Sequence, residues 1–146
     1  MSNLETTQAI YQAFGQGDVP TIMSHLAEDV AWEAWEANSA QDAGVPLMQP
    51  RTGRAGAAEF FALASTYEII DFQVLDFAVS AHQVIAEVVI ELKSPDTGRS
   101  YRDEELHLWT FDEAGKVSRL RHYTDTAKHI AATTVPAGAY DGALSR

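Results

Sequence analysis

The sequence contains no cysteine among its 146 residues, which excludes disulfide bonds and thiolate chemistry. Basic residues are scarce: 10 Lys and Arg stand against 21 Asp and Glu, and the formal net charge is −11. Such a chain lacks the basic surface that nucleic acid or an anionic membrane needs. No segment approaches the roughly 20 apolar residues that span a bilayer, and no basic stretch followed by an apolar run marks a signal peptide. We therefore expect a cytoplasmic protein that binds neither nucleic acid nor membranes.

Motifs for cofactors and metals are missing as well. The segment Gly53-Arg54-Ala55-Gly56 is predicted to be a loop-to-helix junction, because it lacks the pattern of a phosphate-binding loop. No spacing of His, Asp and Glu along the chain matches a structural metal site, and zinc is not expected without cysteine. We predict no cofactor and no metal.

Helical patterns dominate the first half of the chain. Ser2 and Glu5 are spaced as a capping box, and a helical apolar face follows as far as Phe14. Asp18 is a candidate N-cap for a second, short helix. Alternation over residues 30–35 predicts a strand, residues 36–53 predict a long loop, and a third helix is expected over about residues 55–65.

From Ile69 onward the period changes to two. Two strands are predicted up to about Leu92, and residues 105–125 predict a β-hairpin around the turn 112–116. Helices followed by antiparallel strands indicate the α+β class. We expect a single domain over residues 1–135, with helices covering one apolar face of a curled sheet, and a loosely held tail over residues 136–146.

Several motifs resemble the SnoaL-like branch of the nuclear transport factor two (NTF2)-like superfamily. They are Gly-x-Gly-Asp at 15–18, Glu-Asp-Val-Ala-Trp-Glu at 28–33, and Phe-Asp-Glu-x-Gly-Lys-Val at 111–117 followed by Arg-x-Tyr-x-Asp at 121–125. The resemblance implies a cone-shaped fold in which a strongly curved, mostly antiparallel sheet encloses an apolar pocket. It also implies a homodimer formed through the sheets.

Two branches of the superfamily match only in part. Ketosteroid isomerases use a protonated aspartate on the hairpin as an oxyanion donor; the corresponding residue is His107, which can still donate. Their catalytic base corresponds to Ala34, and their oxyanion tyrosine lies one position away from Tyr11. Limonene epoxide hydrolases use an Arg-x-Asp pair on the central strand, where this chain has Val88 and Ile90. The resemblance therefore implies neither steroid isomerisation nor epoxide hydrolysis.

SnoaL-type polyketide cyclases match best. They use an aspartate at the end of the last strand as general acid and base, and the resemblance implies that role for Asp125. Residue type alone favours the other role for Asp125, a cap for the segment that begins at Thr126. Periodicity leaves open whether His107 faces inward, and the resemblance favours it. His122 could approach Asp125 or point outward, whereas His129, like the remaining histidines, is expected to be solvated.

The predicted function is cofactor-free acid–base chemistry on a hydrophobic carbonyl compound, such as cyclisation, isomerisation or dehydration. Asp125 would transfer the proton and His107 would polarise the enolate oxygen, assisted by His122. If Asp125 and His107 lie in one apolar cavity, burial should lower the pKa of the His107 imidazole. The alternative is a non-catalytic ligand-binding or interaction domain. Residues expected to bind the hydrophobic ligand are Tyr11, Phe14, Trp32, Phe61, Val88, Ile90 and Trp109.

Overall fold

The structure is a computed structural model that describes residues 1–33 and 35–134, and it confirms the α+β class. The helices are α1 (Asn3–Gly15), α2 (Val19–Ser24), α3 (Ser39–Asp42), α4 (Gly53–Ala64) and α5 (Thr126–Thr133), with a 3₁₀ helix, η1, at Pro46–Met48. The strands are β1 (Leu26–Trp32), β2 (Arg51–Thr52), β3 (Glu68–Val79), β4 (Gln83–Lys93), β5 (Ser100–Phe111) and β6 (Val117–Tyr123).

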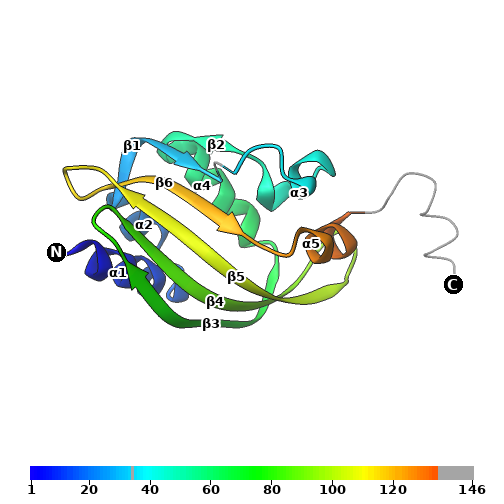
Figure 1. Ribbon diagram of the computed structural model, residues 1–146. Coiled ribbons are helices and arrows are strands. Elements are labelled where there is room, and N and C mark those ends of the chain that lie inside the picture. The colour runs from blue at the N-terminus through cyan, green and yellow to red at the C-terminus, as the bar shows by residue number, and fades with distance from the viewer. Residues whose placement is uncertain (34, 135–146) are drawn as a thin grey trace, which may run out of the picture.

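The six strands form one curved sheet in the order β2-β1-β6-β5-β4-β3. Neighbouring strands are antiparallel except β1 and β6, which are parallel. Figure 1 shows the long strands bent across α1, α2 and α4, while α5 lies beside the N-terminal end of β5. The predicted mostly antiparallel sheet covered by helices is confirmed. Among the described residues, no helix is long and apolar enough to cross a membrane.

The predicted helix starts are confirmed. Ser2 Oγ accepts from the Glu5 backbone N–H, and a Glu5 carboxylate oxygen accepts from the Ser2 N–H, each at 3.1 Å. These bonds satisfy donors that the first turn of α1 would otherwise leave free. The Asp18 side chain accepts from the Thr21 N–H at 3.2 Å and caps α2.

Two predictions about the middle of the chain need correction. The first strand begins at Leu26 rather than near Val30, because its register shifts between Leu26 and Ala31 and this hides the simple alternation. The segment predicted as a loop over residues 36–53 contains α3, η1 and β2, which are too short to show a period in the sequence. Ala34 and the predicted loose tail over residues 136–146 lie outside the described residues.

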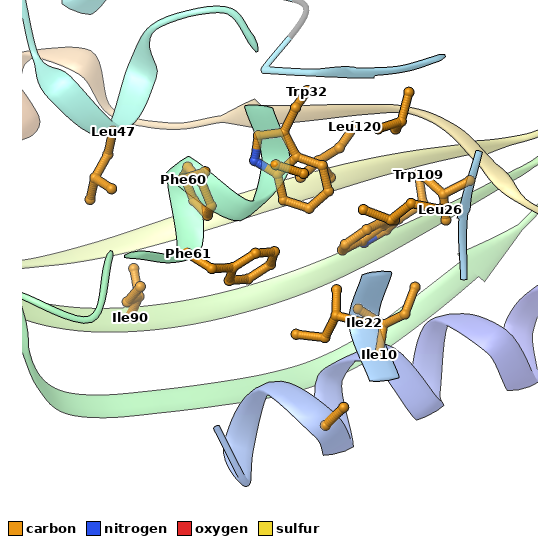
Figure 2. Close-up of a cluster of buried hydrophobic side chains, with 14 of the residues drawn as sticks. Ile10, Ile22, Leu26, Trp32, Leu47, Phe60, Phe61, Ile90, Trp109 and Leu120 are labelled. Carbon is orange, nitrogen blue, oxygen red and sulfur yellow. The ribbon is translucent and has the colours of Figure 1, made fainter. Parts of the chain in front are cut away.

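The hydrophobic core lies between the helices and the concave face of the sheet. Figure 2 shows Trp32, Phe60 and Phe61 close together, with Ile90 and Trp109 of the sheet on either side of Phe61. The Trp32 ring centroid lies 5.5 Å from that of Phe60 and 5.3 Å from that of Phe61. Each buried aromatic side chain removes roughly 150–250 Å² from water. These packed side chains form part of the wall of a cavity within the core.

Candidate functional site

An apolar cavity lies between α1, α4 and the inner face of the sheet. Its volume is about 80 Å³, so a ligand with several fused rings would enter only if side chains shifted. Most of its wall is aliphatic or aromatic, and one side carries titratable groups. The lining residues that the argument uses are Tyr11, Glu105, His107, Trp109, His122 and His129.

The alternation of β5 places polar side chains in this apolar space. Tyr101, Asp103, Glu105, His107 and Trp109 are spaced two residues apart, and each is at least nine-tenths buried. In an extended strand every second side chain points to the same face. Buried polar groups are costly unless they are hydrogen-bonded, so their partners determine what this side of the cavity can do.

A chain of hydrogen bonds joins Trp109, Tyr11, His107 and Glu105. Trp109 Nε1 donates to the Tyr11 hydroxyl at 3.0 Å, the hydroxyl lies 2.6 Å from His107 Nδ1, and His107 Nε2 lies 3.0 Å from Glu105 Oε1. A carboxylate only accepts, so Nε2 carries the proton and Nδ1 accepts from Tyr11. Burial and the nearby charge of His122 lower the pKa of His107. His107 is therefore a neutral imidazole.

His122 is the cross-strand partner of His107, with ring centroids 4.3 Å apart. Its Nδ1 is in ion-pair contact with Glu33, and its Nε2 lies 4.0 Å from Glu105 Oε1, beyond hydrogen-bond distance. Burial alone would lower its pKa, but the charges of Glu33 and Glu105 and the Glu33 contact raise it. The raised pKa favours the imidazolium form of His122, and its Nε2–H lies beyond hydrogen-bond distance of Glu105.

Glu33 reaches this position through an unusual backbone conformation. β1 runs parallel to β6 with Trp32 opposite Leu120, so the next residue arrives near His122. Glu33 has a φ of 58°, and this turn leaves both Trp32 and Glu33 1% exposed. In a continuous strand the two side chains would point to opposite faces. Alternation therefore could not identify Glu33, although a positive φ at a non-glycine residue is often associated with function.

A second cluster lies beside α5. We call it the sealed cluster because its side chains are hydrogen-bonded to one another, although its His129 also lines the cavity and its Asp103 lines a surface hollow. His129 Nε2 is 3.1 Å from both Asp103 Oδ2 and Glu105 Oε2, and its Nδ1 is 3.2 Å from the Tyr101 hydroxyl. Burial alone would lower the pKa of His129, but the two carboxylates raise it to about 9. Burial is the largest influence on Asp103 and raises its pKa. The prediction that His129 is solvated is wrong, because α5 packs its ring onto these carboxylates.

Glu105 belongs to both clusters. Burial would raise the pKa of its carboxyl, but hydrogen bonds from His107 and His129 and the charge of His122 outweigh burial, so the pKa lies well below its ordinary value. Glu105 is therefore an anion that links the cavity wall to the sealed cluster. Its alternation with His107 was visible in the sequence, but nothing there identified it as the partner of three histidines.

Asp125 does not line the cavity that His107 lines, so the condition on which their joint action depended is not met. β6 ends at Tyr123, and the chain then turns away to begin α5. The Asp125 carboxylate caps this helix by accepting from the Lys128 N–H, and its backbone N–H donates to Asp103 Oδ2 at 3.2 Å. Its side chain lines a separate surface hollow with Arg102, Asp103, Glu104 and Lys128. Asp125 thus has the capping role, the other interpretation that its residue type allowed.

The structure brings most of the predicted ligand-binding residues together. The cavity is lined by Tyr11, Phe14, Trp32, Phe61, Ile90 and Trp109, together with His107 and His122. Val88 is fully buried on the same face of β4 but does not line the cavity. His107 faces inward, as expected, and is stacked against Tyr11 with ring centroids 5.9 Å apart.

Comparison with known proteins identifies the family. A family model for the SnoaL-like domain matches residues 7–120, and the chain therefore belongs to that family within the NTF2-like superfamily. No protein of curated function matches the sequence.

Solved structures share the fold over almost their whole length. A candidate polyketide cyclase from Xanthomonas campestris is 25% identical, with 90% of this chain and 96% of that chain aligned and a TM-score of 0.66. TerC, crystallised with polyporic acid, is 24% identical, with 89% and 96% aligned and a TM-score of 0.71. A Mycobacterium tuberculosis protein in complex with estradiol-17β-hemisuccinate is 14% identical, with 88% and 98% aligned and a TM-score of 0.69.

Proposed function

We propose that this member of the SnoaL-like family binds a flat, apolar carbonyl compound in its cavity and carries out acid–base chemistry on it. The single observation behind the proposal is the pair formed by His107 and His122. Their rings are cross-strand neighbours on the cavity wall, yet their pKa values are shifted in opposite directions. Two titratable groups separated in this way are suited to opposite roles as base and acid.

His122 would act as the acid. Glu33 holds its Nδ1, and the unbonded Nε2–H can donate to the carbonyl oxygen of the ligand while negative charge develops there. Donation strengthens as the oxygen becomes an enolate, so the interaction favours the transition state over the bound ligand.

Tyr11 and His107 would act together as the base. A proton taken from the carbon beside the carbonyl would pass to the Tyr11 oxygen while the tyrosine proton moves to His107 Nδ1 across 2.6 Å. The imidazolium formed on His107 would be stabilised by Glu105, which already accepts from its Nε2. This arrangement follows the logic of a hydroxyl–imidazole–carboxylate triad. Burial raises the pKa of Tyr11, so the phenol stays protonated between turnovers.

Proton exchange on a bound ketone tests the proposal. Cyclic and aromatic ketones that raise the melting temperature would be incubated in D₂O, and deuterium incorporation next to the carbonyl would be followed by NMR. His122→Gln should slow exchange on the order of 10²–10³-fold, the range for losing one oxyanion donor. Tyr11→Phe should slow it as well, because the relay loses its hydroxyl.

The pH dependence gives a second readout. Exchange should be bell-shaped, falling at low pH as His107 is protonated and at high pH as His122 loses its proton. Ligands that bind with no exchange above the buffer rate would overturn the catalytic proposal. Such a result would support a non-catalytic binding domain, a reading favoured by the apolar Ile90 on the cavity wall, at a position where hydrolase relatives carry a charge.

We also propose that two copies pair through the outer face of the sheet. Leu106 is 44% exposed there, and Ile85, Val89 and Leu108 are partly exposed on the same face. An apolar patch of this kind is stabilised when a second copy covers it. Light scattering at micromolar concentration should give the mass of a dimer, and a monomer would refute the proposal.

A further inference from the structure

We propose that Glu105, His107 and His122 form a binding site for a divalent transition-metal ion, with Zn²⁺ as the reference ion. One ligand atom from each side chain lies within 4.8 Å of the other two. Glu105 Oε1 is 3.0 Å from His107 Nε2 and 4.0 Å from His122 Nε2. Ligands bound at about 2.0–2.2 Å in tetrahedral geometry lie roughly 3.3–3.6 Å apart. Small side-chain shifts would therefore place all three around one ion.

The ligand set has the chemistry of an open metal site. Two histidines and one carboxylate leave a coordination position free for water or substrate, as in catalytic zinc sites and non-haem iron sites. All three side chains line the cavity, so an oxygen of a bound ligand could take the remaining position. The spacing of these residues along the chain gave no sign of such a site, because cross-strand pairing of β5 and β6 brings them together.

Each of the three side chains is already held from behind. His122 Nδ1 contacts Glu33, the Tyr11 hydroxyl lies 2.6 Å from His107 Nδ1, and His129 Nε2 lies 3.1 Å from Glu105 Oε2. Outer partners of this kind, above all a carboxylate on the far nitrogen of a histidine, orient metal ligands in proteins. They leave His107 Nε2 at 3.0 Å and His122 Nε2 at 4.0 Å from Glu105 Oε1.

Glu33 is the outer partner of His122. Its carboxylate is 99% buried, and within residues 1–33 and 35–134 neither oxygen has a hydrogen-bond partner of good geometry. A buried carboxylate is costly unless a cation compensates it, and for Glu33 that cation is the His122 ring, whose Nδ1 is in ion-pair contact with it. An ion bound to His122 Nε2 would keep the imidazole proton on Nδ1, directed toward Glu33. The positive charge of the ion would also attract the Glu33 carboxylate across the ring.

The neighbouring group of Asp103, Glu105 and His129 also has three ligand atoms within 4.8 Å of one another. It is the weaker candidate, because it offers one imidazole where the cavity-facing group offers two, and imidazole nitrogen is a preferred ligand of Zn²⁺. The sealed group therefore serves as an internal control for the cavity-facing one.

The role of the ion rests on the proposed function, but its binding does not. At the carbonyl oxygen of a bound ligand, the ion would replace the His122 proton as the electrophile. An ion on His107 Nε2 would leave the proton of that neutral imidazole on Nδ1, so the proton relay through Tyr11 would operate only in the metal-free protein.

Calorimetric titration of Zn²⁺ into chelator-treated full-length protein tests the site. We expect one ion per chain, and Co²⁺ should give the visible absorption bands of a low-coordinate site. His107→Gln and His122→Gln should each weaken binding at least tenfold, and Glu33→Gln should weaken it about 10–100-fold through the outer contact. His82→Gln, at an exposed histidine, and Asp103→Asn, in the sealed group, should leave the affinity unchanged. Circular dichroism checks each fold, and His107→Asn replaces a His107→Gln protein that does not fold.

The absence of stoichiometric binding at millimolar Zn²⁺ would overturn the inference, as would binding that survives both histidine substitutions or is lost in Asp103→Asn. Different results would overturn the proposed function and the metal site. Ketone exchange that depends on His122 in the presence of chelator, without metal binding, would leave the acid–base proposal standing alone. Metal binding by a protein that exchanges no ketone proton would leave only the metal site.

Discussion

Two histidine–carboxylate centres meet at Glu105, and they differ in how completely their polar atoms are bonded. In the sealed centre, His129 contacts two carboxylates through Nε2 and the Tyr101 hydroxyl through Nδ1. In the cavity-facing centre, His122 Nε2 lies 4.0 Å from the nearest carboxylate oxygen, and Glu33 has no well-formed hydrogen bond. Both centres are buried and both have shifted pKa values. Buried polar atoms that lack a well-formed hydrogen bond, rather than burial or shifted pKa values, therefore distinguish a functional site from a structural network.

The largest effect should come from Glu105, which belongs to both centres. Glu105→Gln removes the anion between His129 and His122, and breaking a buried ion pair from one side costs about 3–5 kcal/mol. We expect a loss of that size in the free energy of unfolding, measured by urea denaturation, together with loss of ketone exchange.

Glu104→Gln is the matched control for this substitution. Glu104 is the adjacent residue of β5 but lies exposed on the other face, and a surface change of this kind should stay within about 0.5 kcal/mol. Equal losses from the two variants would show that Glu105 does not couple the two centres.

The sealed centre should contribute a pH-dependent part of the stability. The pKa of His129 is raised from 6.5 to about 9, so the folded state binds its proton more tightly than the unfolded state does. The resulting stabilisation is fully present below about pH 6.5 and is lost as pH rises toward 9; its upper bound is about 3 kcal/mol. Because His122 is shifted in the same direction, comparison with His129→Gln isolates the contribution of His129.

Urea denaturation between pH 6 and about pH 9.5 measures this difference. The free energy of unfolding should fall less steeply with pH in His129→Gln than in the natural protein. Identical slopes would mean that His129 is not held as an imidazolium, and the contrast between the two centres would lose its electrostatic basis. His129→Gln should also retain a larger share of ketone exchange than His122→Gln.

Local patterns were sufficient to predict much of the fold. Caps such as Ser2 and Asp18, and the period of two along β4 and β5, depend on contacts within a few residues. The same period puts His107 and Glu105 on one face of β5, but both faces of this strand are mixed, so only the resemblance indicated which of them lies inward. Short elements such as α3 and β2 could not be predicted, because they depend on packing against distant parts of the chain.

The site was only partly predictable, for a related reason. Glu33 approaches His122 through a left-handed backbone turn and the parallel pairing of β1 with β6, and neither leaves a mark in the sequence pattern. His129 is buried because α5 folds back onto β5. The resemblance to SnoaL-type cyclases pointed to an aspartate at the end of the last strand, but in this chain the corresponding residue begins a helix.

The smallest effect should come from Asp125, outside both centres. Asp125→Asn keeps a side-chain oxygen that can accept from the Lys128 N–H, so stability should change by less than about 0.5 kcal/mol, whereas Asp125→Ala should cost about 1 kcal/mol through loss of the cap. Neither variant should alter ketone exchange, because the carboxylate lines a surface hollow and not the cavity. Melting temperature and exchange rate, measured alongside His122→Gln, test this directly. An Asp125→Asn protein that melts normally but no longer exchanges ketone protons would return the catalytic role to Asp125. In that case the cavity-facing histidines would belong with the structural network, and the distinction between the two centres would not hold.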